Sequence, residues 1–169
     1  KINETYNRNY LRAEYGFVQS SATMAAKWER FAEDGDEYYL QYRTAHDDKV
    51  RPEHAALDRV TLPMSDPFWE SYYPPNGWNC RCTVVQVLKW KYDATPHDEA
   101  MDRGKEALDG ERFNIFRFNS GKQGKAVPDY NPYTFKKCNS CSLAKGDPNA
   151  SIPKNELCSA CKIIRTQKK

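Results

Sequence analysis

The chain has 169 residues, with 26 Lys and Arg against 23 Asp and Glu, which gives a formal net charge of +3. Only 39% of the residues are hydrophobic, but aromatic side chains bury a large area each, so the 11 Tyr, 7 Phe and 4 Trp argue against a disordered chain. No apolar run approaches the roughly 18 residues of a membrane helix and no signal-peptide pattern is present, so we expect no membrane partner. The length predicts one ordinary core with a small appendage. Because the chain begins without Met inside a predicted helix, we expect it to be part of a longer protein.

The charge is distributed unevenly. Residues 1–120 carry 16 Lys and Arg against 20 Asp and Glu, a balance of −4. Residues 121–169 carry 10 against 3, a balance of +7. A basic tail on a mildly acidic body predicts contact between the tail and a polyanion or an acidic partner. The alternative is a tail that is simply solvated.

Residues 1–34 have the periodicity of a helix, with apolar residues three, four or seven positions apart. Ser20 or Ser21 is placed to cap a second helical segment within this range. Asp34-Gly35-Asp36 predicts a break, after which residues 37–45 alternate bulky and polar side chains as a half-buried strand does. The apolar residues that define the helical face are Ile2, Tyr6, Tyr10, Leu11, Phe17, Met24, Trp28 and Phe31.

Four shorter elements are predicted next. Residues 51–58 form a short helix with a proline in its first turn, where the missing N–H is tolerated. Residues 60–64 are extended, and residues 66–73 form a helical turn capped by Asp66. Residues 80–90, CRCTVVQVLKW, are rich in Val and Thr and make the clearest strand of the chain.

The last predicted elements complete an α+β body. Residues 95–110 form a helix with a Thr-Pro start and a glycine past its end, and residues 112–118, RFNIFRF, are a candidate strand. The expected fold is N-terminal helices packed on a small mixed or antiparallel sheet, followed by a zinc-ribbon or knuckle-like module. The expected domains are a body of residues 1–120, a linker of residues 121–135 and a four-cysteine tail of residues 136–169.

The tail contains a pattern typical of a structural zinc site. Cys138 and Cys141 form one C-x2-C pair, and Cys158 and Cys161 form a second pair after sixteen residues. Two such turns complete a tetrahedron of thiolates around Zn²⁺, with no position left for a substrate. The intervening segment has too few apolar residues to fold by burial, so metal binding must supply its folding free energy. The alternative is a pair of disulfides.

A second group of polar side chains gathers near two predicted strand ends. One interpretation is catalysis, with a histidine as the base beside a nucleophile or a carboxylate. Another is a metal site formed by His54, Cys80 and Cys82. Alternating side chains on a strand would direct the two thiols to opposite faces, which argues against this metal site unless a bulge intervenes. The members of the group are His46, Asp47, Asp48, Arg51, His54, Cys80, Arg81 and Cys82.

The favoured interpretation of this group is structural. Arg81 would form bidentate bonds with Asp47 or Asp48 and so tie the two strand ends together. We expect this to be a buried ion pair, so that removing one partner would cost about 3–5 kcal/mol of the free energy of unfolding.

Two segments of the body resemble a known protein family. The order T-x-x-D-x-x-V-R-P-x-H-x-x-L-D, followed by P-P-x-x-x-x-C-R-C, is similar to the phage Mu F-like family of phage head morphogenesis proteins. The resemblance covers about residues 1–90 and does not include the cysteine tail. The matching residues are Thr44, Asp47, Val50, Arg51, Pro52, His54, Leu57, Asp58, Pro74, Pro75, Cys80, Arg81 and Cys82.

The resemblance implies a minor head protein of a tailed double-stranded DNA phage or prophage, acting in capsid assembly or DNA delivery, and it brings no catalytic residues. Its partners would be other head and portal proteins, with weak, non-specific contact between the tail and packaged DNA. It would reside in the capsid interior or at the portal, and in the host cytoplasm during assembly. The alternative is a small nuclease or toxin-like enzyme that uses His46, His54 and Arg81.

The chain departs from the family pattern at several positions. Some relatives carry cysteines at the positions of Arg51 and His54. Many relatives carry a histidine two residues after the second proline, where this chain has Gly77. A glycine usually follows the Leu-Asp pair, where this chain has Arg59. The resemblance implies that relatives with Cys and His at the positions of Arg51, His54 and Gly77 hold a metal ion that this chain has partly or wholly given up.

Overall fold

The computed structural model describes residues 2–127. The chain divides into two compact units, Lys1–Asp129 and Tyr130–Lys169, and the fold described below is that of the first unit. The four tail cysteines lie outside the described residues, so the zinc site predicted for them stays a prediction. No helix within residues 2–127 is both long enough and apolar enough to cross a membrane.

A single long helix, α1 (Ile2–Asp34), begins the fold. The expectation of a second segment starting at Ser20 or Ser21 is wrong, because both residues lie within the continuous helix. This part of the chain contains no proline, and three alanines after the serines favour helix over a break. The predicted break at Gly35 is present, since the residue has a positive φ of 56°.

The predicted apolar face of α1 is buried from Phe17 to Phe31, and the side chains of Ile2 and Tyr6 lie outside the described part of the chain. Phe17, Met24, Trp28 and Phe31 are each at most 8% exposed, as their spacing predicts. Leu11 was assigned to the same face but is 61% exposed. Leu11 follows directly after Tyr10, which belongs to the predicted face. Because successive helical residues are rotated by about 100°, the side chain of Leu11 points away from the body.

Three short strands form an antiparallel sheet in the order β2-β1-β3. Leu40 pairs with Leu62, and Tyr42 pairs with Val84, which places buried side chains next to one another. The predicted strands at 37–45 and 80–90 are therefore present but shorter than expected. The strands are β1 (Tyr39–Arg43), β2 (Thr61–Pro63) and β3 (Thr83–Val87).

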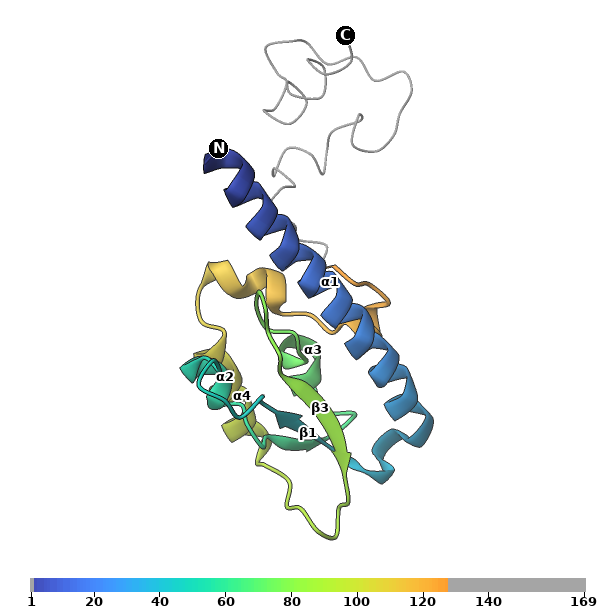
Figure 1. The fold of residues 1–169 in the computed structure, drawn as a ribbon. Coiled ribbons are helices and arrows are strands. Elements are labelled where there is room, and N and C mark those ends of the chain that lie inside the picture. The colour runs from blue at the N-terminus through green and yellow to red at the C-terminus, as the bar shows by residue number, and fades with distance from the viewer. Residues whose placement is uncertain (1, 128–169) are drawn as a thin grey trace, which may run out of the picture. The chain divides into compact units, whose positions relative to one another are not determined.

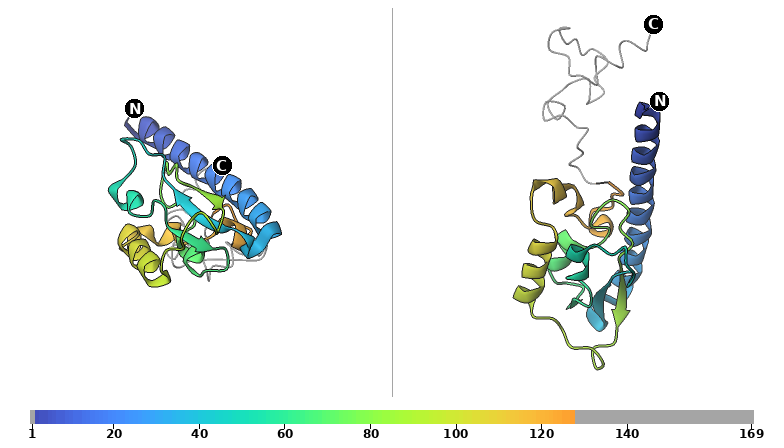
Figure 2. Two further views of the ribbon diagram at one scale, coloured as in Figure 1. Left: turned by 90° about the horizontal axis from the view of Figure 1, so that it is seen from below. Right: turned by 60° about the vertical axis from the view of Figure 1, so that its left-hand side comes forward.

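Short helices complete the body. Figures 1 and 2 show α1 along one side of the sheet, with α2 and α4 on the side away from α1. The prediction that Asp66 caps the helical turn at residues 66–73 is wrong, because the N-cap of α3 (Phe68–Tyr72) is Pro67. Asp66 lies one residue earlier, and its side chain accepts a hydrogen bond of 2.8 Å from the backbone N–H of Phe68. The elements are η1 (Gly35–Glu37), α2 (Pro52–Ala55), α3 (Phe68–Tyr72), α4 (His97–Ala107), η2 (Glu111–Phe116) and α5 (Ser120–Gln123).

The strand predicted for residues 112–118 is wrong, because most of this segment forms the 3₁₀ helix η2. Two of its three aromatic side chains are buried against α1 instead of on a sheet. Phe116 and Phe118 are each 4% exposed and contact Phe17 with ring centroids 5.4 and 6.2 Å apart. Apolar alternation thus reflects packing on a helix here and not strand pairing.

The core lies between the sheet and the helices and is rich in aromatic rings. α4 approaches α3 so closely that a Cβ on Gly104 would lie 2.5 Å from the ring of Tyr72. Asn119 joins α5 to the core, because its side chain accepts from the N–H groups of Gly121 and Lys122 and donates to the carbonyl of Trp69. Fully or almost fully buried apolar residues include Leu40, Tyr42, Leu57, Val60, Leu62, Phe68, Trp69, Tyr73, Val84 and Leu108.

Candidate functional site

The sheet brings the two motif segments together. In the antiparallel pairing of β1 with β3, Arg43 at the end of β1 lies opposite Thr83 at the start of β3. The residues after Arg43 and the residues before Thr83 therefore leave the sheet at the same edge. The first motif segment, residues 44–58, consequently faces the second, residues 74–82.

The guanidinium of Arg81 pairs with the carboxylate of Asp47 by two hydrogen bonds of 2.5 and 2.7 Å. The predicted contact is confirmed, and Asp47 is the partner instead of the exposed Asp48. The expectation that the pair is buried is wrong, since the side chains of Arg81 and Asp47 are 49% and 37% exposed. Hydrogen bonds from Arg81 lower the pKa of Asp47 to about 2.

Asp58 holds the first motif segment in shape. Its Oδ1 accepts from the backbone N–H of Thr44 at 2.9 Å and from the Thr44 hydroxyl at 3.2 Å. The same oxygen lies 3.1 Å from Nε2 of His46, which has a positive φ of 54°. Arg59, which follows Asp58, also has a positive φ, of 63°. The position where the family resemblance implies a glycine therefore has a left-handed backbone.

Arg51 bridges the two segments. Its Nη2 donates to the carbonyl of Trp78 at 2.5 Å. A Cβ on Gly77 would lie 3.0 Å from Nη1 of Arg51 and 3.7 Å from Cε1 of His54. The position where the family resemblance implies a histidine is thus next to His54, and the Arg51 guanidinium occupies the space beside it.

His54 lies between the two thiols of the second segment. It is carried by α2 and is 3% exposed, and its Nδ1 lies 3.6 Å from Sγ of Cys80 and 3.6 Å from Sγ of Cys82. The ligand atoms of the three residues all lie within 4.8 Å of one another. These three residues form a group that can hold a metal ion.

The prediction that the two thiols point to opposite faces is wrong because residues 80–82 are not part of a strand. β3 begins only at Thr83, and Cys80 still belongs to a turn in which its N–H donates to the carbonyl of Gly77. Asn79, in the same turn, has a positive φ of 56°. The chain thus reorients just before the sheet, and both sulfurs face α2.

The pKa values of the Cys80 and Cys82 thiols are shifted in opposite directions. Hydrogen bonding from Cys82 and from His54 lowers the pKa of Cys80, against the opposing effect of burial. The hydrogen bond to Cys80, together with burial, raises the pKa of Cys82. Cys80 therefore takes the thiolate form first, with Cys82 as its donor. Burial also raises the pKa of the neighbouring Tyr42, whose hydroxyl donates to Asn76 at 2.8 Å.

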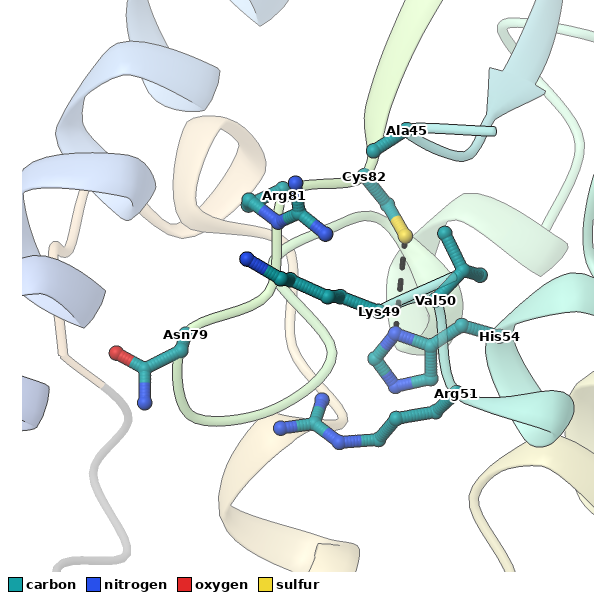
Figure 3. A pocket seen from close by; sticks show the side chains of 8 residues that line it. All are labelled: Ala45, Lys49, Val50, Arg51, His54, Asn79, Arg81 and Cys82. Carbon is teal, nitrogen blue, oxygen red and sulfur yellow. Dashed lines mark hydrogen bonds between the residues drawn. The ribbon is translucent and has the colours of Figure 1, made fainter. Parts of the chain in front are cut away.

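A pocket of about 200 Å³ opens next to His54 and Cys82 (Figure 3). The two side chains point toward each other at its wall, and the side chain of Arg51 runs beside them. Three cationic residues and no carboxylate line the pocket within residues 2–127, so its charge favours an anion. The lining residues are Ala45, Lys49, Val50, Arg51, His54, Asn79, Arg81 and Cys82.

The residues proposed for the enzyme alternative have separate partners. His46 contacts Asp58, Arg81 pairs with Asp47, and His54 lies between the two cysteines. Their contacts join one segment of the chain to another and do not form a nucleophile–base pair with a histidine that is oriented by a carboxylate.

Residues 1–85 match the protein family described as Phage Mu protein F like protein. The chain belongs to this family. The resemblance inferred from the two motif segments is confirmed, and the family match ends just after Cys82 and includes both of them. No solved structure matches the chain significantly.

Two curated relatives support the assignment. Capsid assembly protein F of Escherichia phage Mu is 34% identical in an alignment of 139 positions that covers 72% of this chain and 31% of that protein. The Mu-like prophage FluMu F protein of Haemophilus influenzae is 38% identical over 71 residues, which are 41% of this chain and 17% of that protein. The chain spans less than a third of the length of either relative.

Proposed function

We propose that this chain is a structural part of the head of a tailed phage or prophage and acts in capsid assembly, without an enzymatic role. The observation that supports this most strongly is the family match over residues 1–85 together with a relative named as a capsid assembly protein. Its partners are other head and portal proteins, and its place is the capsid interior or the portal. During assembly it passes through the host cytoplasm.

The contacts of the motif residues support a structural role. Asp47 with Arg81, Asp58 with Thr44, and Arg51 with the Trp78 carbonyl each join two parts of the backbone. Side chains used in this way define the shape of a surface.

The outer face of α1 supports a contact with another head protein. Leu11, Tyr15 and Val18 are 61%, 71% and 38% exposed, and their spacing of four and three places them on one helical face. An exposed apolar stripe of this kind is typical of protein interaction sites. Replacing Leu11 and Tyr15 by Gln should leave the fold of the body unchanged and reduce incorporation into heads. Equal incorporation would assign this contact to another surface.

The basic tail is proposed to bind one structural Zn²⁺ through its four cysteines and to contact packaged DNA weakly and without sequence preference. The charge balance of +7 in residues 121–169 supports this. Each phosphate neutralised should lower the affinity by roughly 0.9 log units per log unit of salt. A salt titration of duplex binding should show such a slope for the whole chain. A version that ends at Asp129 should bind little, and equal binding by that version would remove the tail from the proposal.

The assembly role is tested in the phage or prophage that encodes the chain. Deleting the coding segment should yield few complete heads, and the wild-type chain supplied in trans should restore them. Supplying a chain with His46→Gln should restore them too, because the contact of His46 with Asp58 is half-exposed and no catalysis is assigned to it. Normal heads after the deletion would contradict the proposal, and failure of His46→Gln with a folded chain would favour the enzyme alternative.

A further inference from the structure

Three ligand atoms converge where the two motif segments meet. The sulfurs of Cys80 and Cys82 are each 3.6 Å from Nδ1 of His54. In a tetrahedral zinc site, bonds of about 2.3 Å to sulfur and about 2.05 Å to nitrogen separate these ligand atoms by about 3.6 Å. We propose that His54, Cys80 and Cys82 bind one zinc ion, with the fourth coordination position directed toward the adjacent pocket.

Hydrogen bonding alone accounts poorly for this arrangement. One imidazole nitrogen carries either one proton or one lone pair, so it makes one good hydrogen bond and not two. The two sulfurs are nevertheless at the same distance from the same nitrogen. Convergence of several ligand atoms on one point is the geometry that a metal ion requires. Imidazole and thiolate are also the ligand types that zinc prefers.

The surroundings suit a bound cation with two thiolates. His54 and Cys80 are 3% and 8% exposed, so the centre would be shielded from water on most sides. Loss of two thiol protons on binding gives a net charge of zero for Zn²⁺ with two thiolates and a neutral histidine. Such a centre tolerates the nearby guanidinium of Arg51, which an unscreened Zn²⁺ would repel.

The fourth ligand is a water molecule or an anionic group from a partner. Lys49, Arg51 and Arg81 line the adjoining pocket, and within residues 2–127 no Asp or Glu does. Without a carboxylate to accept a proton from bound water, hydrolytic chemistry lacks its base. The ion therefore has a structural role and links α2 to the loop before β3. The exposed contacts Asp47–Arg81 and Arg51–Trp78 join the same two segments.

The test is the zinc content of the full-length chain and three variants of it. Because the tail cysteines are also expected to bind zinc, a tail-serine variant (Cys138→Ser, Cys141→Ser, Cys158→Ser, Cys161→Ser) isolates the body. It should retain one zinc per chain by elemental analysis. Adding His54→Gln should weaken zinc binding at least tenfold in competition with a chelator. Adding His97→Gln, at a histidine that contacts Asp66 instead, should leave binding unchanged.

X-ray absorption at the zinc edge provides a second measurement that does not depend on folding of the His54 variant. The tail-serine variant should show two sulfur ligands and two nitrogen or oxygen ligands. A folded tail-serine variant that contains no zinc, or zinc without sulfur ligands, would overturn the proposal. A disulfide between Cys80 and Cys82 in freshly purified chain would overturn it as well. The outcome does not depend on whether the chain acts in head assembly.

Discussion

Arg81 donates from both terminal nitrogens to the two carboxylate oxygens of Asp47, and so joins the loop after β1 to the loop before β3. The two side chains come from segments that are 34 residues apart in the chain. Both are half-exposed, so the pair contributes far less to stability than a buried pair does. Its main effect is on the position of the two loops and on the ionisation of Asp47.

Replacing Arg81 by Ala should raise the pKa of Asp47 from about 2 toward the ordinary value of about 3.9, because the hydrogen bonds that favour the carboxylate are lost. NMR titration of the side-chain carboxyl measures this shift. Because the pKa of Asp47 is lower in the folded chain than in the unfolded chain, the ionised carboxylate stabilises the fold above about pH 4. This contribution to stability is lost as the pH falls through about 2.

The matched control for this prediction is Arg103→Ala, which removes the ion pair between Arg103 and Glu99 on α4. The side chains of this pair are about as exposed as those of Arg81 and Asp47. The two variants should have similar melting temperatures, since each loses one exposed pair. Only Arg81→Ala should change the titration of Asp47. An unchanged pKa of Asp47 in Arg81→Ala would show that the contact does not persist in solution.

Replacing Asp58 by Ala should lower the free energy of unfolding by about 1–3 kcal/mol, because the Thr44 N–H and hydroxyl lose their acceptor in a partly buried site. Chemical denaturation measures the change. Asp48→Ala, at an exposed carboxylate four residues after Thr44, is the control and should change stability by less than about 0.5 kcal/mol. Equal effects of the two variants would contradict the assigned role of Asp58.

Replacing Arg59 by Gly should raise the free energy of unfolding by about 0.5 kcal/mol. The backbone of Arg59 has a φ of 63°, which costs a non-glycine residue about 1–2 kcal/mol, and the greater freedom of glycine in the unfolded chain offsets part of the gain. Arg43→Gly, in a strand, should destabilise the chain. A loss of stability in Arg59→Gly would mean that the exposed contact of Arg59 with Asp58 outweighs the backbone strain.

Two glycine-to-alanine variants should change stability in opposite directions, although both glycines lie inside helices. Gly104→Ala should lower the free energy of unfolding by about 1–3 kcal/mol, because the new methyl group would meet the buried ring of Tyr72 at 2.5 Å. Gly16→Ala should raise it by about 0.5–1 kcal/mol, because nothing lies within 4 Å and alanine favours the helix. The same sign for both would contradict the packing of α4 on α3.

Apolar periodicity predicted most elements correctly, because it reports burial directly. The face of α1 from Phe17 to Phe31 is an example, and so are the strands around Leu40 and Val84. The failure at 112–118 has the same origin. Alternating Phe residues there bury their rings on α1, and burial alone does not distinguish a helix surface from a sheet as the partner.

The candidate site was only partly predictable. The pairing of Asp47 with Arg81 follows from opposite charges at two adjacent strand ends, which the sequence shows. The convergence of His54, Cys80 and Cys82 is predicted less well, because β3 begins only at Thr83, three residues after the start of the predicted strand. The turn-rich letters PPNGWN before Cys80 are the signal that the backbone is still turning there.

The central claim is that this chain is a structural component of a phage head. The most direct measurement is quantitative mass spectrometry of heads purified from the phage or prophage that encodes it. The account predicts peptides from residues 8–127 in the heads, at a constant ratio to the portal protein across independent preparations. Absence of these peptides from heads at every stage of assembly, with the chain recovered only in the unassembled fraction, would contradict it.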